Sequence, residues 1–399
     1  MSGRYLKIED FCSTGSGGTP SKSKPEYYEG GDIPWVKSGD LKDSTIYKAN
    51  EYITAAGLEN SSAKIVEKDS ILIAMYGATV GRLAILGINA AINQAICNIR
   101  PDTTIADMRY LYYFLKSKFS YFVENAVGGA QPNISQGFIK SLEVPLPSLS
   151  EQKRIAAILD KANGIYQKRQ KAIKLADDFL RATFLEMFGD PVSNPKGWKV
   201  KPLKELSVKI ASGSTPKGGS KVYVDKGITF FRSQNVWKND IRLDDVAYID
   251  EKTHNSLKKS SLKNKDILMT KTGRFNTENS SLGRAALFLG KDDSANVNGH
   301  VYLIRLKSGM LHEFIVYILT SNEYREHIRE VCVGGIDKRQ INKEHIEDFP
   351  IICPPDDLQI EFMRKLNLIQ KIRSNAMTGL KEVTPLFNTL SQKAFSDGF

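Results

Sequence analysis

The chain has 399 residues, 41% of them hydrophobic and 25% charged, which is the composition of a globular protein with two or three domains. No apolar run is long enough to span a membrane, and the opening MSGRYLKIEDF lacks the layout of a secretion signal, so we expect a cytoplasmic protein. The formal net charge is +11, but residues 1–150 carry 15 basic and 15 acidic side chains, whereas residues 191–355 carry 27 and 19. The basic excess favours a polyanionic partner for the second region.

The first region is predicted to form an α/β domain. A Gly- and Pro-rich stretch leads into a short apolar strand predicted at Ile33–Val36, which is followed by the polar run KSGD. Short apolar runs bounded by turn residues are typical of strands, and bulky residues at helical spacing are typical of helices. We therefore expect strands at Ser70–Met75, Arg82–Leu86 and Ala91–Ile99, and a helix at Met108–Lys118.

A long helix is predicted over Glu151–Asp190, which contains no proline. Apolar or small residues alternate three and four positions apart along it, as in the seam of a coiled coil. The seam comprises Ile155, Leu159, Ala162, Ile173, Ala176, Leu180 and Met187. Tyr166, Arg169 and Thr183 interrupt it, and we expect Tyr166 and Arg169 to set the register against a partner helix.

After Pro191 the same series of motifs begins again. ITFFRSQNVW corresponds to IPWVKSGDLK, NVNGHVYLIR to AINQAICNIR, and VGGIDKRQINKEHI to VGGAQPNISQGFI. A shared order of motifs, at an offset that drifts from about 195 to 207 positions, indicates a tandem duplication.

The C-terminal stretch repeats the helical seam at an offset of 207 positions. Its members are Phe362, Leu366, Ile369, Leu380, Val383, Phe387 and Ala394. Neither helix can bury its seam alone, so we expect the two to pack against each other as an antiparallel pair. Pro385 removes a backbone hydrogen bond and is expected to kink or break the second helix.

The predicted fold is therefore a tandemly duplicated α/β domain, each copy followed by a long helix. The two helices form an antiparallel, coiled-coil-like spacer with pseudo-two-fold symmetry. We place the globular domains at residues 1–150 and 191–355, and the helices at residues 151–190 and 356–399.

Motifs that would support catalysis are missing from the sequence. It contains no GxxxxGK[ST] loop, no HExxH pair, no GxSxG elbow and no NPPY- or DPPY-like run of an amino-methyltransferase. The five histidines and four cysteines show no zinc-binding spacing, and reduced thiols are expected. We therefore expect no catalytic residue, cofactor or metal in this chain.

The sequence resembles the specificity subunit (S, HsdS-type) of type I restriction–modification systems over essentially its whole length. The resemblance is carried by GGTPS…YY…IPWVKSGDL, the exit VPLPSLSEQKRIAAIL and the closing LFNTLSQKAF, although the end SQKAFSDGF departs slightly from the usual pattern. It implies two target-recognition domains, each reading one half of a bipartite double-stranded DNA site. It also implies that the helices act as a spacer and dock two methyltransferase subunits, which carry S-adenosylmethionine. A separate restriction subunit would carry ATP- and Mg-dependent translocation and cleavage.

Corresponding loops differ between the halves, so we expect an asymmetric target with a non-specific gap. The loops carry Arg, Lys, Asn, Gln and Asp, which can read base edges. The candidates in the first domain are Lys37, Ser38, Asp40, Tyr76, Arg82, Asn93, Gln94 and Asn133. Those in the second are Arg232, Ser233, Gln234, Asn235, Lys271, Arg274, Arg284, Asn298, His300, Lys338 and Arg339.

Alternatives remain for some of these residues and for the chain as a whole. Part of the set is expected to bind phosphates, and the repeated Gly–Arg pairs at Arg82 and Arg284 favour a role in the fold or at a phosphate. Asn93 and Asn298 can also be structural turn residues. For the whole chain, the other readings are a paired-helix adaptor that binds proteins and a part of a fused restriction–methylation enzyme.

Overall fold

The structure is a computed structural model that describes residues 4–129, 131–274, 280–335 and 338–396, apart from the side chains of residues 387, 388 and 396. The chain divides into two compact units. The first comprises residues 1–172 and 376–399, and the second residues 173–375. Each unit therefore contains one globular α/β part and stretches of both long helices. Within the described ranges, no helix is long and apolar enough to cross a membrane.

The first unit is built on two mixed sheets. One has the strand order β2-β10-β7-β8-β4 and the other β5-β3-β9-β6, and the outer strands β1 and β11 pair with each other. The strands are β1 (Arg4–Lys7), β2 (Cys12–Ser16), β3 (Ile33–Val36), β4 (Ser44–Ile46), β5 (Glu51–Ile53), β6 (Ile65–Val66), β7 (Ile71–Ala74), β8 (Leu83–Leu86), β9 (Ala90–Ile92), β10 (Ile96–Pro101) and β11 (Glu143–Leu146). The short helices are α1 (Ile8–Phe11), α2 (Ala55–Glu59), α3 (Met108–Ser117), α4 (Phe119–Glu124) and α5 (Gln136–Lys140).

The second unit repeats this plan. Its sheet β13-β23-β19-β21 matches β2-β10-β7-β8, and its sheet β14-β18-β15-β22 holds the counterparts of β5, β3 and β9. The main strands are β12 (Val200–Pro202), β13 (Ser207–Ser212), β14 (Tyr223–Val224), β15 (Ile228–Phe231), β18 (Ala247–Ile249), β19 (Ile267–Thr270), β21 (Ala285–Leu287), β22 (Ala295–Val297), β23 (Val301–Leu306) and β26 (Pro350–Ile352). Two small additional sheets contain β16 (Val236–Trp237), β17 (Asp240–Ile241), β20 (Thr272–Gly273), β24 (Val333–Gly334) and β25 (Arg339–Gln340). The helices are α7 (Leu203–Leu206), α8 (Glu251–Ser256), α9 (His312–Thr320), α10 (Asn322–Val331) and α11 (Lys343–Glu347).

The single strand predicted at Ala91–Ile99 is wrong, because the chain forms two strands there. β9 pairs with β3 and β6, the chain turns at Asn93, and β10 then pairs with β2 and β7 in the other sheet. Apolar residues fill both strands, so their alternation hides the change of sheet.

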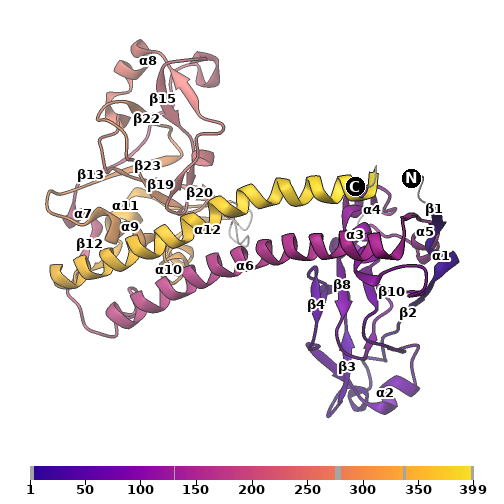
Figure 1. Ribbon diagram of the computed structural model, residues 1–399. Helices are drawn as coiled ribbons and strands as arrows, with labels where there is room; N and C mark the ends of the chain where they lie inside the picture. The colour runs from indigo at the N-terminus through magenta and orange to yellow at the C-terminus, as the bar shows by residue number, and fades with distance from the viewer. Residues whose placement is uncertain (1–3, 130, 275–279, 336–337, 397–399) are drawn as a thin grey trace. The chain divides into compact units, whose positions relative to one another are not determined.

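The two long helices are α6 (Leu149–Phe188) and α12 (Asp356–Ser396), drawn in magenta and yellow in Figure 1. They run antiparallel within each unit. In the first unit, the guanidinium of Arg169 lies where a Cβ on Gly379 would stand, so α12 needs a glycine at this crossing. This contact fits the predicted register-setting role of Arg169. In the second unit, Arg373 Nε lies 2.9 Å from Asp177 Oδ1.

The predicted break at Pro385 does not occur, because α12 continues through this residue as a helix. On the residue just before it, the Thr384 hydroxyl donates a hydrogen bond to the Leu380 carbonyl at 2.8 Å. The kink stays a prediction. Of the predicted seam, Ile155, Leu159 and Phe362 are buried, whereas the side chain of Phe387 lies outside the described residues.

The end of each helix packs on the globular part of a unit through aromatic rings. At the end of α6, Phe188 lies 5.1 Å from Phe314 of α9, measured between ring centroids. At the end of α12, Phe395 lies 5.3 Å from Tyr110 of α3. These are equivalent positions of the duplicated sequence, so the same aromatic contact between a long helix and a short helix is present in both units.

Replacing Phe184 tests this packing. Phe184 is 1% exposed and contacts Phe188, Phe314, Tyr317 and Phe362. Phe184→Ala should lower the free energy of unfolding of the second unit by about 3–5 kcal/mol, because it leaves a cavity among aromatic rings. Phe179→Ala, on the same helix but 62% exposed, should change it by less than about 0.5 kcal/mol. Urea unfolding of both variants measures the difference, and equal losses would contradict the packing.

Candidate nucleic-acid interface

A parallel pair of strands delivers polar loops to one edge of each unit. β3 pairs in parallel with β9, with Val36 opposite Ile92, and β15 pairs with β22 in the same way, with Phe231 opposite Val297. Parallel strands end side by side, so the residues that follow them lie together. In the first unit these are the runs KSGD and NQ, and in the second RSQN and NGH.

Three backbone hydrogen bonds join four loops of the first unit at this edge. The Asn93 N–H donates to the Val36 carbonyl at 3.0 Å, and the Met75 N–H donates to the Ala95 carbonyl at 2.8 Å. The Ile134 N–H then donates to the Met75 carbonyl at 3.0 Å. Peptide groups therefore set the separation of the loops, and side chains are free to differ.

The second unit forms the same three bonds at equivalent positions. The Asn298 N–H donates to the Phe231 carbonyl, and the Lys271 N–H donates to the His300 carbonyl, both at 2.9 Å. The Ile341 N–H donates to the Lys271 carbonyl at 3.0 Å. We call these loops, residues 36–40, 75–76, 93–95 and 133–134 in the first unit and 231–235, 271–272, 298–300 and 340–341 in the second, the four-loop frame.

Most of the residues predicted to contact DNA lie on this frame. In the first unit it carries Lys37, Ser38, Asp40, Tyr76, Asn93, Gln94 and Asn133, and in the second Arg232, Ser233, Gln234, Asn235, Lys271, Asn298 and His300. Arg339 adjoins it in β25, where it pairs with Gly273, and Arg274 and Lys338 flank that pairing as exposed residues.

The repeated Gly–Arg pairs stand one strand away from the frame. Arg82 and Arg284 accept hydrogen bonds at their backbone carbonyls from Ala74 and Thr270. The preceding residues, Gly81 and Gly283, have φ of 79° and 67°, in the left-handed region that favours glycine. A turn that needs this conformation explains why the glycine recurs.

Charges on the frame of the first unit are largely paired. The Lys37 ammonium forms an ion pair with Glu51 and lies 5.7 Å from the centre of the Trp35 ring. The Asp40 carboxylate accepts hydrogen bonds from the Lys37 backbone N–H at 2.9 Å and from the Asn50 amide at 2.6 Å.

Two amides of this frame have contrasting surroundings. Gln94 is exposed, and its side-chain oxygen accepts a hydrogen bond from the Thr19 hydroxyl. Asn93 has a buried side-chain oxygen that lacks a partner, although its backbone holds the turn. The backbone of Asn93 therefore fits the expected role as a turn residue, whereas its side-chain oxygen has no structural partner among the described residues.

In the second unit, one carboxylate organises the loop after β15. Asp245 accepts a hydrogen bond from the Arg232 guanidinium at 2.9 Å and another from the Gln234 amide. These two bonds, with the positive charge of Arg232, hold the pKa of the Asp245 carboxyl below its ordinary value. The Asp245 side chain is 74% exposed, whereas that of Arg232 is 22% exposed.

Asn235 holds this loop from inside. Its side-chain oxygen accepts the Arg232 N–H at 2.9 Å, and its amide donates to the carbonyls of Arg242 and Asp245 at 3.1 and 3.0 Å. The residue is 1% exposed. The structure gives Asn235 a structural role, equivalent to that of Asp40, and leaves its side chain no surface for a direct contact with DNA.

Sequence reasoning named Arg284 but missed Trp237 and Arg242, with which it forms a cationic stack beside this loop. The central guanidinium carbons of Arg242 and Arg284 lie 3.4 and 3.7 Å from the centre of the Trp237 ring. Trp237 and Arg242 stand where the first half has Lys42 and Tyr47. The sequence signal was an aromatic residue with arginines in a loop that differs between the halves.

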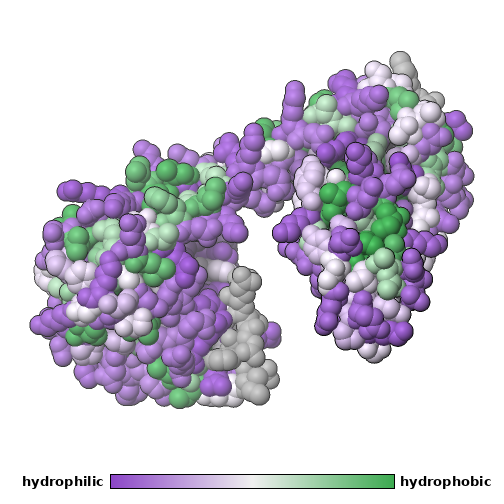
Figure 2. Space-filling view, turned by 90° about the horizontal axis from the view of Figure 1, so that it is seen from below, coloured by the Kyte–Doolittle hydropathy of each residue, from purple (hydrophilic) through white to green (hydrophobic). Residues whose placement is uncertain are grey.

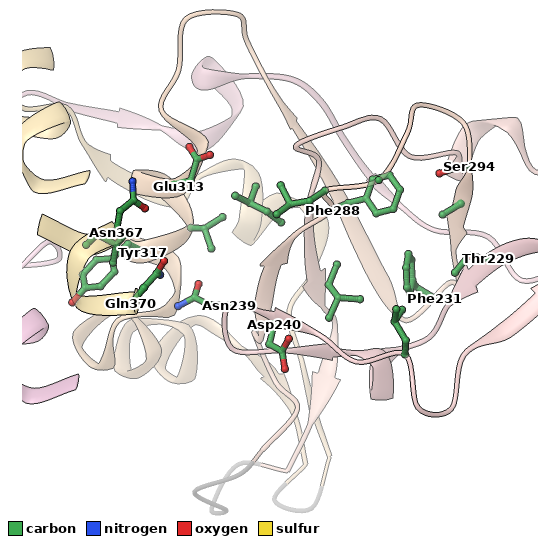
Figure 3. A pocket seen from close by; sticks show the side chains of 18 residues that line it. Thr229, Phe231, Asn239, Asp240, Phe288, Ser294, Glu313, Tyr317, Asn367 and Gln370 are labelled. Atoms are coloured by element: carbon green, nitrogen blue, oxygen red, sulfur yellow. The ribbon is translucent and has the colours of Figure 1, made fainter. Parts of the chain in front are cut away.

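An apolar cavity of about 610 Å³ lies elsewhere in the second unit, between the β-layer and helices α9 and α12 (Figure 3). Phe231, Phe288, Tyr317 and Leu366 line it, and Glu313 and Asp240 are its charged residues. Its acidic, apolar lining does not suit a polyanion, so we place the candidate interface at the four-loop frame. Among the described residues, no group of His, Cys, Asp or Glu is arranged to hold a metal ion.

Comparison with known proteins shows the same two-part organisation. The family described as "Type I restriction modification DNA specificity domain" matches residues 4–175 and 195–383. The chain is 27% identical over 402 residues to the type I restriction enzyme MjaIX specificity subunit of Methanocaldococcus jannaschii, covering 95% of this chain and 89% of that protein. It is 32% identical over 150 residues to the EcoR124I/EcoR124II specificity subunit of Escherichia coli, covering 36% of this chain and 37% of that protein.

A solved structure has a similar fold. The type I restriction–modification S subunit from M. genitalium matches with a TM-score of 0.61 at 17% identity, over 99% of this chain and 96% of that chain. At this identity the likeness supports the fold alone.

Proposed function

The chain belongs to the family of type I restriction modification DNA specificity domains, and we propose that it is the DNA-recognition subunit of a type I restriction–modification complex. Each unit reads one part of a two-part DNA site with its four-loop frame. The observation that carries this proposal is the repetition of one backbone frame with two different sets of side chains.

The chemistry of the frame suits double-stranded DNA. Lysine, arginine and amide side chains at the loop tips match the donors and acceptors of base edges in the major groove, and part of the set serves the phosphates. Because Lys37–Ser38–Gly39 in one unit stand where Arg232–Ser233–Gln234 stand in the other, the two parts of the target differ in sequence.

Membership of the family implies a recognition role without catalysis. The proposal therefore assigns methylation, with S-adenosylmethionine, to methyltransferase subunits, and ATP- and Mg-dependent cleavage to restriction subunits. It places the complex in the cytoplasm, where the four cysteines, which are free thiols in the structure, stay reduced.

The helix pair offers a docking surface for two methyltransferase subunits. In the first unit, Ile165 of α6 and Leu386 of α12 are exposed. Their neighbours Tyr166 and Thr384 line the same pocket, so the two exposed residues lie at a similar position along the helix pair. In the second, Phe179 and Ile372 are exposed beside the Asp177–Arg373 ion pair.

The two exposed pairs are related by the 207-residue repeat, since Ile165 corresponds to Ile372 and Phe179 to Leu386. Figure 2 shows hydrophobic residues in patches on the visible face of both units. A repeated apolar pair fits two copies of one partner better than a single asymmetric partner.

Selection from random DNA tests the recognition role. The chain, assembled with its methyltransferase subunits, should enrich a motif of two defined parts separated by a gap of fixed length, as sequencing of the bound duplexes would show. A hybrid that carries residues 1–150 of another family member should change one part and leave the other unchanged. The donor should have aromatic residues at the positions of Tyr110 and Phe114, which pack on Phe395.

Three outcomes would contradict this account. A hybrid that changes both parts argues against reading by separate units. Absence of any enriched motif, with the methyltransferase present, supports a protein-binding adaptor instead. Methylation of DNA by the purified chain with S-adenosylmethionine alone would show that it is itself an enzyme.

Introducing a negative charge on the helix pair tests the docking surface. Phe179→Glu should weaken the binding of one methyltransferase subunit by about tenfold or more, because it places a charge in an apolar contact. Ile165→Glu should do the same for the other. Gln167→Glu adds the same charge beside the Tyr166 pocket and should leave assembly unchanged. Mass measurement of the titrated complexes gives the stoichiometry, and undiminished two-to-one assembly by Phe179→Glu would place the interface elsewhere.

A further inference from the structure

We propose that the open edge of β21 is a docking groove, in which an extended segment of the methyltransferase subunit is added as a strand to the sheet of the second unit. The segment takes the place that β4 has beside β8 in the first unit. This inference rests on the proposed function, since it names a further contact by which the methyltransferase partner of that function is held.

In the first unit the chain fills this edge itself. The Asp43 N–H donates a hydrogen bond to the Leu83 carbonyl at 2.9 Å, and β4 then pairs in parallel with β8. The pairing ends where the Gly87 N–H donates to the Ile46 carbonyl, also at 2.9 Å. Ile46 is buried in an apolar cluster of the unit. The edge of β8 is therefore closed by backbone hydrogen bonds and covered by an apolar side chain.

In the second unit the chain begins the same pairing and then leaves it. The Asn239 N–H donates to the Ala285 carbonyl at 2.9 Å, and Asn239 has the same φ of 54° as Asp43. The chain then folds back as β17, which pairs with β16 in a separate two-stranded sheet. Within the described part of the chain, no strand pairs with the outer side of β21, which is the last strand of its sheet.

The backbone at this edge is arranged to accept another strand. The Phe288 N–H donates to the Asp266 carbonyl at 2.8 Å, so Phe288 directs its peptide groups toward β19. Successive residues alternate in direction, and Leu287 and Leu289 therefore direct theirs to the outer side. Leu289 corresponds to Gly87, but its N–H has no hydrogen-bond partner among the described residues. An unpaired strand edge is a template for a strand from another chain.

The groove beside this edge is the cavity of about 610 Å³ in Figure 3. Phe231, Phe288 and Leu366 give it an apolar lining. Leu243 and Leu289 also line it and are 62% and 71% exposed, so they stand at its opening. An exposed apolar groove of this kind is typical of a site that binds protein.

A smaller side chain widens the groove from the side of α9. Tyr112 of α3 is buried in the first unit, and its counterpart on α9 is Val316, which lines the groove. The second unit thus lacks both the strand and the tyrosine ring that the first unit has at these positions. The added segment accordingly carries a large apolar side chain, which fills the space that Ile46 and Tyr112 fill in the first unit.

The groove lies within reach of a subunit that docks on the helix pair. Gln370 of α12 lines the groove. Ile372, which belongs to the proposed docking surface, points to the opposite flank of the same helix, because two helical residues are about 200° apart. Half the circumference of a helix with its side chains is about 17 Å, which about five or six extended residues span. A short tail of the docked subunit therefore reaches the groove.

The lining and the duplication narrow the choice of occupant. DNA is a poor one, because the charged residues that line the groove, Asp240 and Glu313, are acidic. Because the first unit fills its own edge, one methyltransferase copy gains a contact that the other lacks. The two copies are therefore held with unequal affinity.

Hydrogen exchange tests whether the edge is paired in the complex. The Leu289 amide should exchange at least about tenfold more slowly when the full chain binds methyltransferase subunits, because it then donates to the added strand. The Gly87 amide, which already donates to Ile46, is the internal control. Its exchange should be the same with and without the partner.

Matched variants test the groove itself. Leu289→Lys places a charge at the opening and should weaken one of the two methyltransferase binding steps by about tenfold or more. Val208→Lys adds the same charge at a residue 62% exposed on β13, the opposite edge of the same sheet, and should leave both steps unchanged. Val316→Tyr restores the ring of the first unit and should weaken the same step as Leu289→Lys. If the larger side chain prevents folding, the exposed Leu289→Lys variant decides alone.

The outcomes separate this inference from the proposed function. If the unmodified chain binds two methyltransferase subunits and selects a gapped motif, unchanged exchange at Leu289 and full binding by Leu289→Lys would overturn the groove alone. Protection that appears only with the restriction subunit, or in the chain alone at rising concentration, would also overturn it, because another protein or a second copy would then fill the groove. An unmodified chain that neither binds methyltransferase nor selects a motif would overturn the proposed function.

Discussion

Aromatic packing at the helix ends is the contact on which the rest of the structure depends. α6 begins on the first globular part, where the Gln152 amide is buried and hydrogen-bonded to the Ile105 and Pro147 carbonyls, and it ends among the aromatic rings of the second unit. α12 begins in the second unit and ends on Tyr110 and Phe114 of the first. Each globular part is thus completed by a helix that starts in the other unit, and the first unit is made from two separate segments, residues 1–172 and 376–399.

The frame of each unit shows how one fold can present two different surfaces. The three hydrogen bonds that join the loops use peptide groups only, so substitution at Lys37, Asn93 or Lys271 leaves the frame intact. Asp40 and Asn235 hold the turns with their side chains. Both accept the equivalent backbone N–H, although one is a carboxylate and the other an amide. Variation in the outermost side chains can then alter recognition at little cost in stability, as expected for loops carried by a rigid scaffold.

The sequence predicts much of this fold because the chain is duplicated. Two copies of each motif reveal the helices, the strand at Ile33–Val36 and most loops of the frame, and the structure confirms the strand with the same bounds. The missed features depend on tertiary contacts. At Asn93 the chain passes from one sheet to the other, and the apolar alternation that continues through both strands hides this change. At Pro385 the residue type alone predicts a break, whereas α12 continues on both sides of it. The Trp237 stack brings Arg284 from a distant part of the chain onto Trp237, and neither Trp237 nor Arg242 is repeated in the first half.

Hydrogen exchange on the assembled complex would test the central claim, that each four-loop frame reads its own part of the DNA, most directly. Amide exchange would be compared without DNA, with the selected duplex, and with duplexes in which one part of the site is scrambled. The account predicts slower exchange at residues 37–40, 75–76 and 93–95 of the first unit and at residues 232–235, 271–272 and 298–300 of the second. Scrambling one part should remove the effect from one unit alone. Loss of protection from both units together, or protection confined to other surfaces, would contradict it.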